Sequence, residues 1–287
     1  MISPAENDVT VSTPAAPESC PACGSGGSPA PTSYIYAAGR VGNPVFPLLS
    51  VEKEFAQAIG RAETTGYTDQ ETLYKALSQP ANRYLARQMC WPFSVQGLDT
   101  YLLQPRHSED FDQLIAAIRP KRSPLDIDVV VGIRGPIAPP EYCNGLMLPI
   151  VAFDQIYSFD RDSLIKAIPR ARDVSEAKFR TAAAEIYDRL IQITDNAGAS
   201  DEHRASNYLA GRYGQVFTVA ADAFARDFSL TAVEARPSPL SGTRRIVDVI
   251  FVFTNRKTDF VEKHMVRVDV TEEFPFLVAK LAPYYDR

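Results

Sequence analysis

The first half of the chain contains short apolar runs separated by segments with helical spacing. Residues Tyr34–Ala38, Phe93–Leu103 and Ile127–Ile133 are rich in aromatic and aliphatic residues, which indicates strands. In Asp110–Arg119 the apolar residues stand three and four positions apart, which predicts an amphipathic helix. This half is therefore expected to combine strands with short helices.

The second half separates into a helical block and a strand block. Residues 159–226 have helical spacing, and the longest helix is expected over Val174–Ala197. Apolar residues then alternate along Arg244–Thr254 and Phe260–Thr271, which predicts a long antiparallel β-hairpin at the C-terminal end. Because helices and strands are grouped rather than regularly alternating, we expect an α+β fold with a mixed or antiparallel sheet.

A segment dense in glycine and proline joins two apolar runs, Ile127–Ile133 and Leu146–Ile156, in the middle of the chain. Three prolines lie within residues 136–140, and proline fixes φ and lacks a backbone donor. A helix or a central strand is therefore excluded there, and we expect a stiff loop. Asp126 and Asp128 lie on one face of the strand before this loop, and we interpret them as its solvent-exposed end.

The first 32 residues differ in composition from the rest. Residues 1–32 contain no lysine, arginine or aromatic residue and are rich in proline, alanine, serine and glycine. Such a segment cannot bury enough apolar surface to offset the entropy of ordering it, which predicts a disordered tail. Residues 33–287 are then expected to form a single α+β domain.

Composition and charge argue against several classes of protein, namely nucleic-acid-binding, membrane-spanning and secreted proteins. The chain is 45% hydrophobic and 23% charged, as is usual for a soluble globular protein, and its formal net charge is −5. This balance argues against nucleic-acid binding through a global positive field. No apolar run approaches the roughly 18 residues of a membrane-spanning helix, and no secretory signal is visible. We therefore expect a cytoplasmic protein with neither a nucleic acid nor a membrane as partner.

The four cysteines suggest a zinc site. Cys20 and Cys23 have the spacing at which two thiolates bind one tetrahedral zinc ion. The other two ligands could be Cys90 and Cys143, or a second copy of the motif in a homodimer. The alternative is a tail with two free thiols, because a single CxxC motif is only moderately specific.

The sequence contains only weak candidates for a catalytic site. Cys143 could act as a nucleophile with His203 or His264 as base, but no cysteine-protease signature surrounds it. The Ser163-x-x-Lys166 pattern is explained by an amphipathic helix. We therefore assign no catalytic residue and expect binding rather than catalysis.

The central loop offers candidate binding residues. Arg134 and Glu141 flank it and could clamp an extended peptide, with Asn144 binding backbone amides and Asp154 following in the next strand. The interpretation we favour for Arg134 and Glu141 is a salt bridge that holds the loop closed. The edge of the C-terminal hairpin could also accept a peptide strand.

Seven strings of the sequence carry a resemblance: Val51–Gln57, Asn82–Gln88, Ile133–Glu141, Cys143–Met147, Phe153–Asp160, Asp195–Gly198 and Val268–Leu277. Together they resemble the C-terminal domain of unknown function of the cyanobactin maturation proteins, the PatA and PatG family. The resemblance extends from about residue 33 to the end.

This resemblance implies a role in the maturation of ribosomal peptides. The family's proteins join this domain to a subtilisin-like protease, whose motifs are not found in this sequence, so its activity is not carried over. The resemblance implies an accessory domain that binds a precursor peptide or a partner enzyme. The alternatives are a zinc-stabilised structural or dimerisation module, and an uncharacterised enzyme centred on Cys143 and Glu141.

Overall fold

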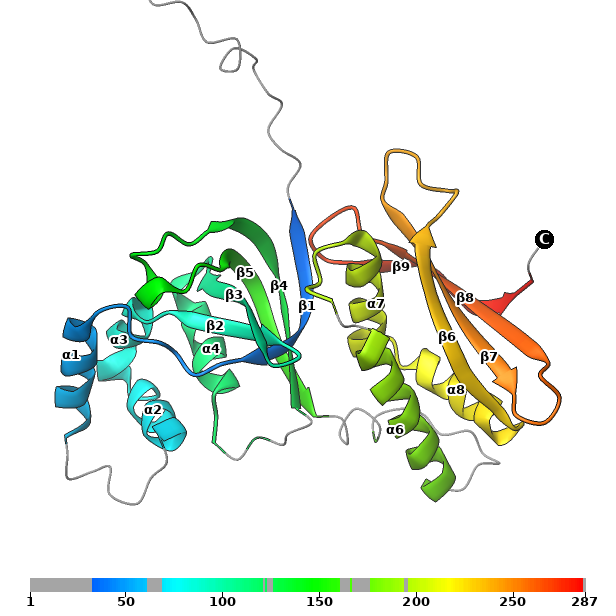
Figure 1. The fold of residues 1–287 in the computed structure, drawn as a ribbon, viewed down its shortest axis with the longest axis horizontal. Helices are drawn as coiled ribbons and strands as arrows, with labels where there is room; N and C mark the ends of the chain where they lie inside the picture. The colour runs from blue at the N-terminus through cyan, green and yellow to red at the C-terminus, as the bar shows by residue number, and fades with distance from the viewer. Residues whose placement is uncertain are drawn as a thin grey trace, which may run out of the picture. The chain divides into compact units, whose positions relative to one another are not determined.

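A computed structural model describes residues 33–60, 69–120, 122, 126–160, 166, 176–193 and 196–285. The described residues from Ser33 onward form one unit. This unit contains two separate sheets with helices packed on them (Figure 1). The α+β fold class expected from the sequence is therefore confirmed.

The first sheet is a closed five-stranded barrel with the strand order β1-β2-β3-β5-β4. Neighbouring strands are antiparallel except β3 and β5, which run parallel, so this sheet is mixed. Closure depends on β1, which pairs with both β2 and β4. The strands are β1 (Tyr34–Val41), β2 (Trp91–Val95), β3 (Leu98–Pro105), β4 (Asp126–Ile137) and β5 (Pro149–Asp160).

Short helices cover the first core, which lies inside and beside the barrel. Trp91 and Phe93 of β2 and Phe153 of β5 are fully buried in it, and the Trp91 indole donates a hydrogen bond of 2.9 Å to the carbonyl of Ala86. The hydrophobic effect of these large side chains holds the helices on the barrel. The helices are α1 (Leu49–Ile59), α2 (Asp69–Leu77), η1 (Pro80–Asn82), α3 (Arg83–Gln88), η2 (Ser108–Asp110) and α4 (Phe111–Ala117).

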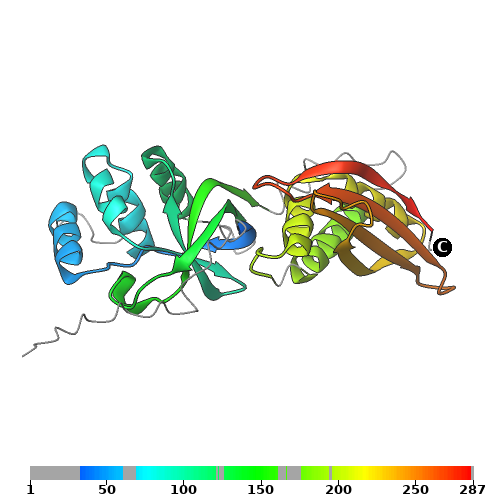
Figure 2. The same cartoon turned by 90° about the horizontal axis from the view of Figure 1, so that it is seen from above.

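The second sheet is antiparallel with the strand order β6-β7-β8-β9, and helices cover one of its faces (Figure 2). The predicted C-terminal hairpin is confirmed as β7 and β8, with Ile250 opposite Met265. Val249 and Phe251 of β7 pack with Phe217 of the last helix in a second core. The elements are α6 (Glu176–Ile193), α7 (Asp201–Arg212), α8 (Gln215–Ala225), β6 (Phe228–Pro237), β7 (Ile246–Asn255), β8 (Val261–Asp269) and β9 (Phe276–Tyr284).

Two sequence-based boundaries are corrected. Strand β5 continues to Asp160, so the predicted helical start at residue 159 is wrong; Ser163 lies outside the described residues. Strand β4 extends to Ile137, although a stiff loop was expected from Arg134 onward. The proline there is tolerated because the ladder with β5 is irregular between Arg134 and Ile137, where a missing backbone donor costs little.

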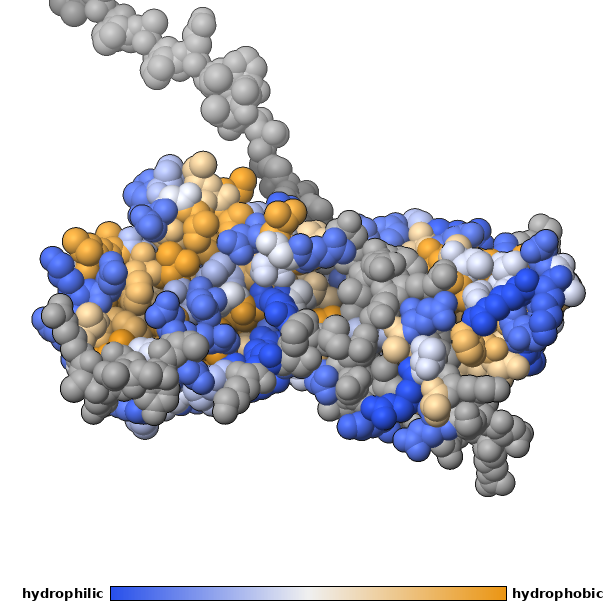
Figure 3. Space-filling model, turned by 60° about the horizontal axis from the view of Figure 1, so that its bottom comes forward, coloured by the Kyte–Doolittle hydropathy of each residue, from blue (hydrophilic) through white to orange (hydrophobic). Residues whose placement is uncertain are grey.

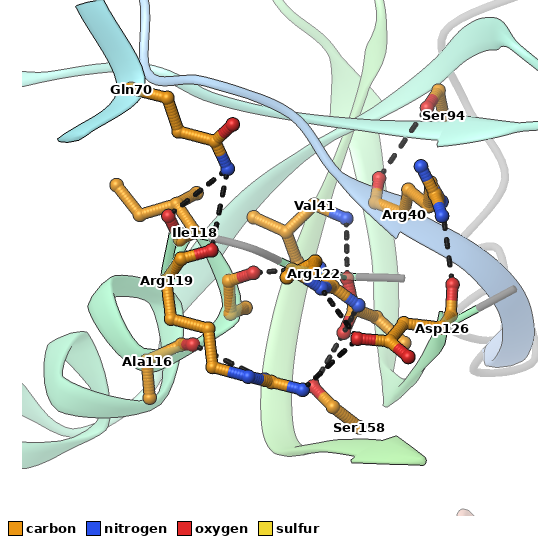
Figure 4. Close-up of polar contacts among 12 residues, drawn as sticks. Arg40, Val41, Gln70, Ser94, Ala116, Ile118, Arg119, Arg122, Asp126 and Ser158 are labelled. Carbon is orange, nitrogen blue, oxygen red and sulfur yellow. Dashed lines mark hydrogen bonds and ion pairs between the residues drawn. The ribbon is translucent and has the colours of Figure 1, made fainter. Parts of the chain in front are cut away.

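A buried ionic cluster lies where β4 begins and β5 ends (Figure 4). Asp128 is fully buried, and its carboxylate accepts hydrogen bonds from Arg122 at 2.7 and 2.8 Å, from Ser158 and from the backbone of Val41. Arg122 also lies 3.6 Å from the carboxylate of Asp126. Our interpretation of the two aspartates as a solvent-exposed strand end is therefore wrong. Burial is possible because every carboxylate oxygen of Asp128 has a charged or polar partner.

Candidate functional site

A cavity of about 350 Å³ opens where β1, β4 and β5 of the barrel meet α7 and the connection between β8 and β9. Its size corresponds to a few amino-acid side chains. Four of its residues are aromatic and one is charged. The lining consists of Tyr36, Val131, Gln155, Tyr157, Tyr208, Arg212, Phe274 and Pro275.

Strand register places the barrel side of the cavity. Tyr36 of β1 lies opposite Val131 of β4, which in turn lies opposite Gln155 of β5, so the three form one row across the sheet. Tyr157 follows two positions after Gln155 and therefore faces the same side. This row is on the outer surface of the barrel and packs against α7.

Helix α7 supplies the opposite wall. Tyr208 and Arg212 are four residues apart and share one helical face. The Tyr208 ring meets the Tyr36 ring edge-on, with 6.1 Å between the centroids, and the Arg212 guanidinium lies 4.1 Å from the centroid of the Tyr157 ring. Gly211 leaves room for this packing, because a Cβ there would lie 3.0 Å from the Tyr157 hydroxyl.

The titratable groups of the cavity keep fixed protonation states near neutral pH. The hydroxyls of Tyr36 and Tyr157 form a hydrogen bond with each other. Burial raises the pKa of Tyr36, Tyr157 and Tyr208 above that of a free phenol. For Arg212, burial lowers the pKa, but the phenol oxygens of Tyr157 and Tyr36 outweigh this effect and the net shift is upward. The cavity therefore presents neutral phenols and one permanent positive charge.

The backbone of Tyr36 is tied to the loop before α7. Its N–H donates to the carbonyl of Gly198 at 3.0 Å, and its carbonyl accepts from the Asn207 side chain at 2.8 Å. Asn196 supports both partners, because its side-chain oxygen accepts from Asn207 and from the Gly198 backbone, each at 2.9 Å. These contacts fix the position of β1 against α7, and with it the relative placement of the two cavity walls.

A buried arginine holds the third wall. Arg204 of α7 is 1% exposed, and its guanidinium donates to the backbone carbonyls of Val270, at 2.6 Å, and Glu272. Burial lowers the pKa of Arg204 to about 10, which still leaves it charged at neutral pH. Arg204 therefore anchors the turn that leads into Phe274 and Pro275. No spacing pattern in the sequence marks Arg204 as part of a site.

An acid pair lies beside the cavity. Arg106 binds the carboxylates of Asp154 at 2.5 Å and Glu273 at 3.3 Å. Burial, together with the nearby Asp154 carboxylate, raises the pKa of Glu273 to about 7. Asp154 was one of the predicted binding residues, and the structure places it in this cluster, next in sequence to Gln155 of the lining.

The other predicted binding residues lie elsewhere. Arg134, Glu141 and Asn144 are exposed on β4 and the β4–β5 connection. In the described part of the chain, no ion pair joins Arg134 to Glu141, so the salt bridge that we favoured is absent from this structure. Binding by these residues stays a prediction. Figure 3 shows hydrophobic residues gathered over the barrel. Exposed apolar side chains in this part of the sequence include Ile137 at the end of β4 and Met147 in the β4–β5 connection.

Cys90 and Cys143 come together, as a shared metal site would require, but they form a disulfide. Metal binding needs deprotonated thiolates, so in this form neither sulfur can bind zinc or act as a nucleophile. Cys20 and Cys23 lie outside the described residues, and zinc binding there stays a prediction. Among the residues that are described, no cluster of three His, Cys, Asp or Glu side chains has the arrangement of a metal site.

Comparison with known proteins gives a match in the C-terminal part of the chain. Residues 173–284 match the family model for the PatG C-terminal region. This part of the chain is therefore similar to PatG C-terminal domains. No curated protein matches the chain at a significant level.

The PatG relationship extends to the fold of the barrel. A solved structure described as "PatG Domain of Unknown Function" superposes with a TM-score of 0.72 over 88% of this chain and 98% of that one, at 19% sequence identity. At this identity the match shows a shared fold. The PatG family match begins after β5, so Tyr208 and Arg212 fall within it, whereas Tyr36 and Tyr157 precede it. The cavity thus combines residues from both parts of the fold.

The cavity residues were largely missed by sequence reasoning. Tyr208 and Arg212 at helical spacing were the available signal on α7. The apolar run Leu146–Ile156, Asp154 and the Phe153–Asp160 string drew attention to β5, but not to Tyr157 itself. The two histidines proposed as bases do not line the cavity. Across the described elements, no helix combines the length and apolarity that crossing a bilayer requires.

Proposed function

We propose that this PatG-like chain is an accessory domain in cyanobactin-type maturation of ribosomal peptides, and that it binds a precursor peptide in the tyrosine- and arginine-lined cavity. The observation that carries the proposal is the cavity itself, in which aromatic rings surround one permanent charge. Aromatic surfaces beside a few polar groups are the usual composition of a binding pocket.

The chemistry of the lining favours binding over catalysis. None of the eight lining residues is a cysteine, serine, threonine, histidine or carboxylate. The phenols of Tyr36 and Tyr157 have raised pKa values and the guanidinium of Arg212 keeps its proton, so none of them exchanges a proton near neutral pH. General acid–base catalysis works best with a group that titrates near the working pH. These side chains are suited to holding a ligand in place.

Isothermal titration calorimetry tests the proposal. Leader, core and C-terminal segments of a cyanobactin-type precursor peptide are titrated separately into the full chain. We expect at least one segment to bind, and we expect Arg212→Ala and Tyr208→Ala to weaken binding about tenfold or more. Absence of heat for every segment at accessible concentrations would contradict the proposal.

Arg256→Ala is the matched control. The Arg256 guanidinium lies 4.1 Å from the centroid of the Phe224 ring, the same separation as between Arg212 and Tyr157, but Arg256 is outside the cavity. Both substitutions remove one positive charge and one cation–π contact. If Arg256→Ala weakened binding as much as Arg212→Ala, the peptide would not be bound at the cavity.

A further inference from the structure

The charge of the cavity lining points to a more specific ligand. We infer that the cavity recognises a carboxylate, and that this group is the C-terminal carboxylate of a peptide whose last side chain is apolar. The inference rests on the proposed function, because it names the part of the peptide that the cavity would bind. Among the lining side chains that the structure describes, Arg212 is the only charged one. An anionic group is therefore the natural complement.

Hydrogen-bond capacity supports the same conclusion. A guanidinium has five N–H donors and no acceptor, and an amide such as that of Gln155 adds two more donors. The bond between Tyr36 and Tyr157 uses one phenol proton, which leaves the other to donate elsewhere. Among the described residues, no carboxylate pairs with Arg212. The lining thus has more donors than acceptors, and a carboxylate, which only accepts, matches this excess.

Neighbouring charges leave the local field positive. Arg212 is in the last turn of α7, where the helix dipole contributes roughly half a negative charge, so about half a positive charge remains. The nearby carboxylates of Asp154 and Glu273 share the charge of Arg106, and the Arg204 guanidinium adds a second positive charge that acts on Glu273. A carboxylate can therefore approach Arg212 without meeting an uncompensated negative group.

The apolar part of the lining suggests what accompanies the carboxylate. Phe274 is 48% exposed, and Pro275 and Val131 add apolar surface beside Arg212. The last side chain of a peptide branches from the same carbon atom that bears the terminal carboxylate, so both can enter one small cavity. An aspartate or glutamate side chain within a peptide would offer the carboxylate without this adjacent apolar group.

Short peptides distinguish a C-terminal carboxylate from the carboxylate of an aspartate or glutamate side chain. The probes are acetyl-Ala-Ala-Phe as free acid and as amide, and acetyl-Ala-Glu-Phe-amide beside its glutamine counterpart, each titrated by calorimetry at low salt. We expect the free acid to bind at least tenfold more tightly than its amide, and the preference to shrink as salt is added. Arg212→Ala should abolish the preference, and Arg256→Ala should preserve it.

A second variant keeps the test informative if Arg212→Ala fails to fold. Gln155→Glu places a negative charge in the lining and should weaken binding of the free acid while leaving the amide unaffected. Equal binding of acid and amide would overturn the inference but leave the proposed peptide-binding function standing. Preference for the glutamate peptide over its glutamine counterpart, without a preference for the free acid, would support a carboxylate site and overturn the C-terminal assignment. If precursor segments bind and none of the short probes does, the inference of a C-terminal carboxylate site is overturned and the proposed peptide-binding function stands.

Discussion

Two sites in the described fold use arginine in opposite ways. Where β4 begins, Arg122 is held by the carboxylates of Asp126 and Asp128, and its charge is compensated inside the protein. In the cavity, Arg212 contacts phenol oxygens and an aromatic face, and none of the described lining residues is a carboxylate. The first arrangement holds structure together, because either partner alone would be a buried unpaired charge. The second leaves a charge for a ligand to complement.

The largest expected effect tests this contrast directly. Asp128→Ala leaves Arg122 without its main partner, and we expect it to lower the free energy of unfolding by about 3–5 kcal/mol. Arg212→Ala leaves no buried charge behind and should change stability by less than about 1 kcal/mol. Urea denaturation of both variants measures the difference. Equal losses of unfolding free energy in the two variants would mean that Arg212 stabilises the fold as much as the pair of Arg122 and Asp128 does.

The disulfide should give the next largest effect on the barrel. Cys90 and Cys143 are separated by 53 residues, so their bond strongly restricts the unfolded chain. We expect dithiothreitol to lower the stability of the protein by about 2–4 kcal/mol. The double variant Cys90→Ser, Cys143→Ser should be insensitive to the reductant, whereas Cys20→Ser, Cys23→Ser should respond as the unchanged protein does. An unchanged melting temperature after reduction would rule out a structural disulfide.

Gly198 tests the junction between β1 and α7. It has a φ of 67°, and a Cβ there would overlap the Tyr36 carbonyl and lie 2.6 Å from the Cα of Ala37. Gly60 has a similar φ of 64° with nothing within 4 Å of the same position. We expect Gly198→Ala to lower the free energy of unfolding by about 2 kcal/mol more than Gly60→Ala does. Both variants strain the backbone at a positive φ, but only Gly198→Ala also forces β1 to move. Similar melting temperatures of the two variants would show that β1 can shift relative to α7 with little loss of stability.

The smallest effect is expected from the acid pair at the cavity rim. The pKa of Glu273 is raised to about 7 in the fold, above that of an exposed glutamate, so the folded state binds the proton more tightly than the unfolded state does. Stability from this group is therefore present in acid and lost as pH rises toward 7. Glu273→Gln should leave stability unchanged near pH 4 and raise it by about 1 kcal/mol at pH 8. A difference that does not vary with pH would contradict the raised pKa.

Local patterns predicted much of the fold. The alternation of apolar residues along β7 and β8 encodes their hairpin, because each strand buries one set of side chains and its partner is close in sequence. The first strand and the longest helix also follow from spacing within one element. Barrel closure does not, because β3 must pair in parallel with β5 and β1 must pair with β4 across long stretches of chain.

The site was less predictable than the fold, for the same reason. Asp128 was taken for a surface residue because nothing within its strand shows that Arg122 comes back to it from the preceding connection. Tyr36, Tyr157 and Tyr208 belong to three elements that meet only in the folded chain, and no spacing rule joins them. The pairing of Cys90 with Cys143 was foreseen only as shared metal ligation, since the sequence does not distinguish a disulfide from a zinc site.

The ties between β1 and the loop before α7 have a consequence for synthesis. Tyr36 is made early, yet Asn207, which binds its carbonyl, follows 171 residues later. At about 5–20 residues per second, the ribosome needs on the order of ten to thirty seconds to produce that partner. Its strand partners β2 and β4 are made during this interval, but the contacts of β1 with α7 cannot form before the interval ends. Strand β1 therefore leaves the ribosome well before it can complete its contacts.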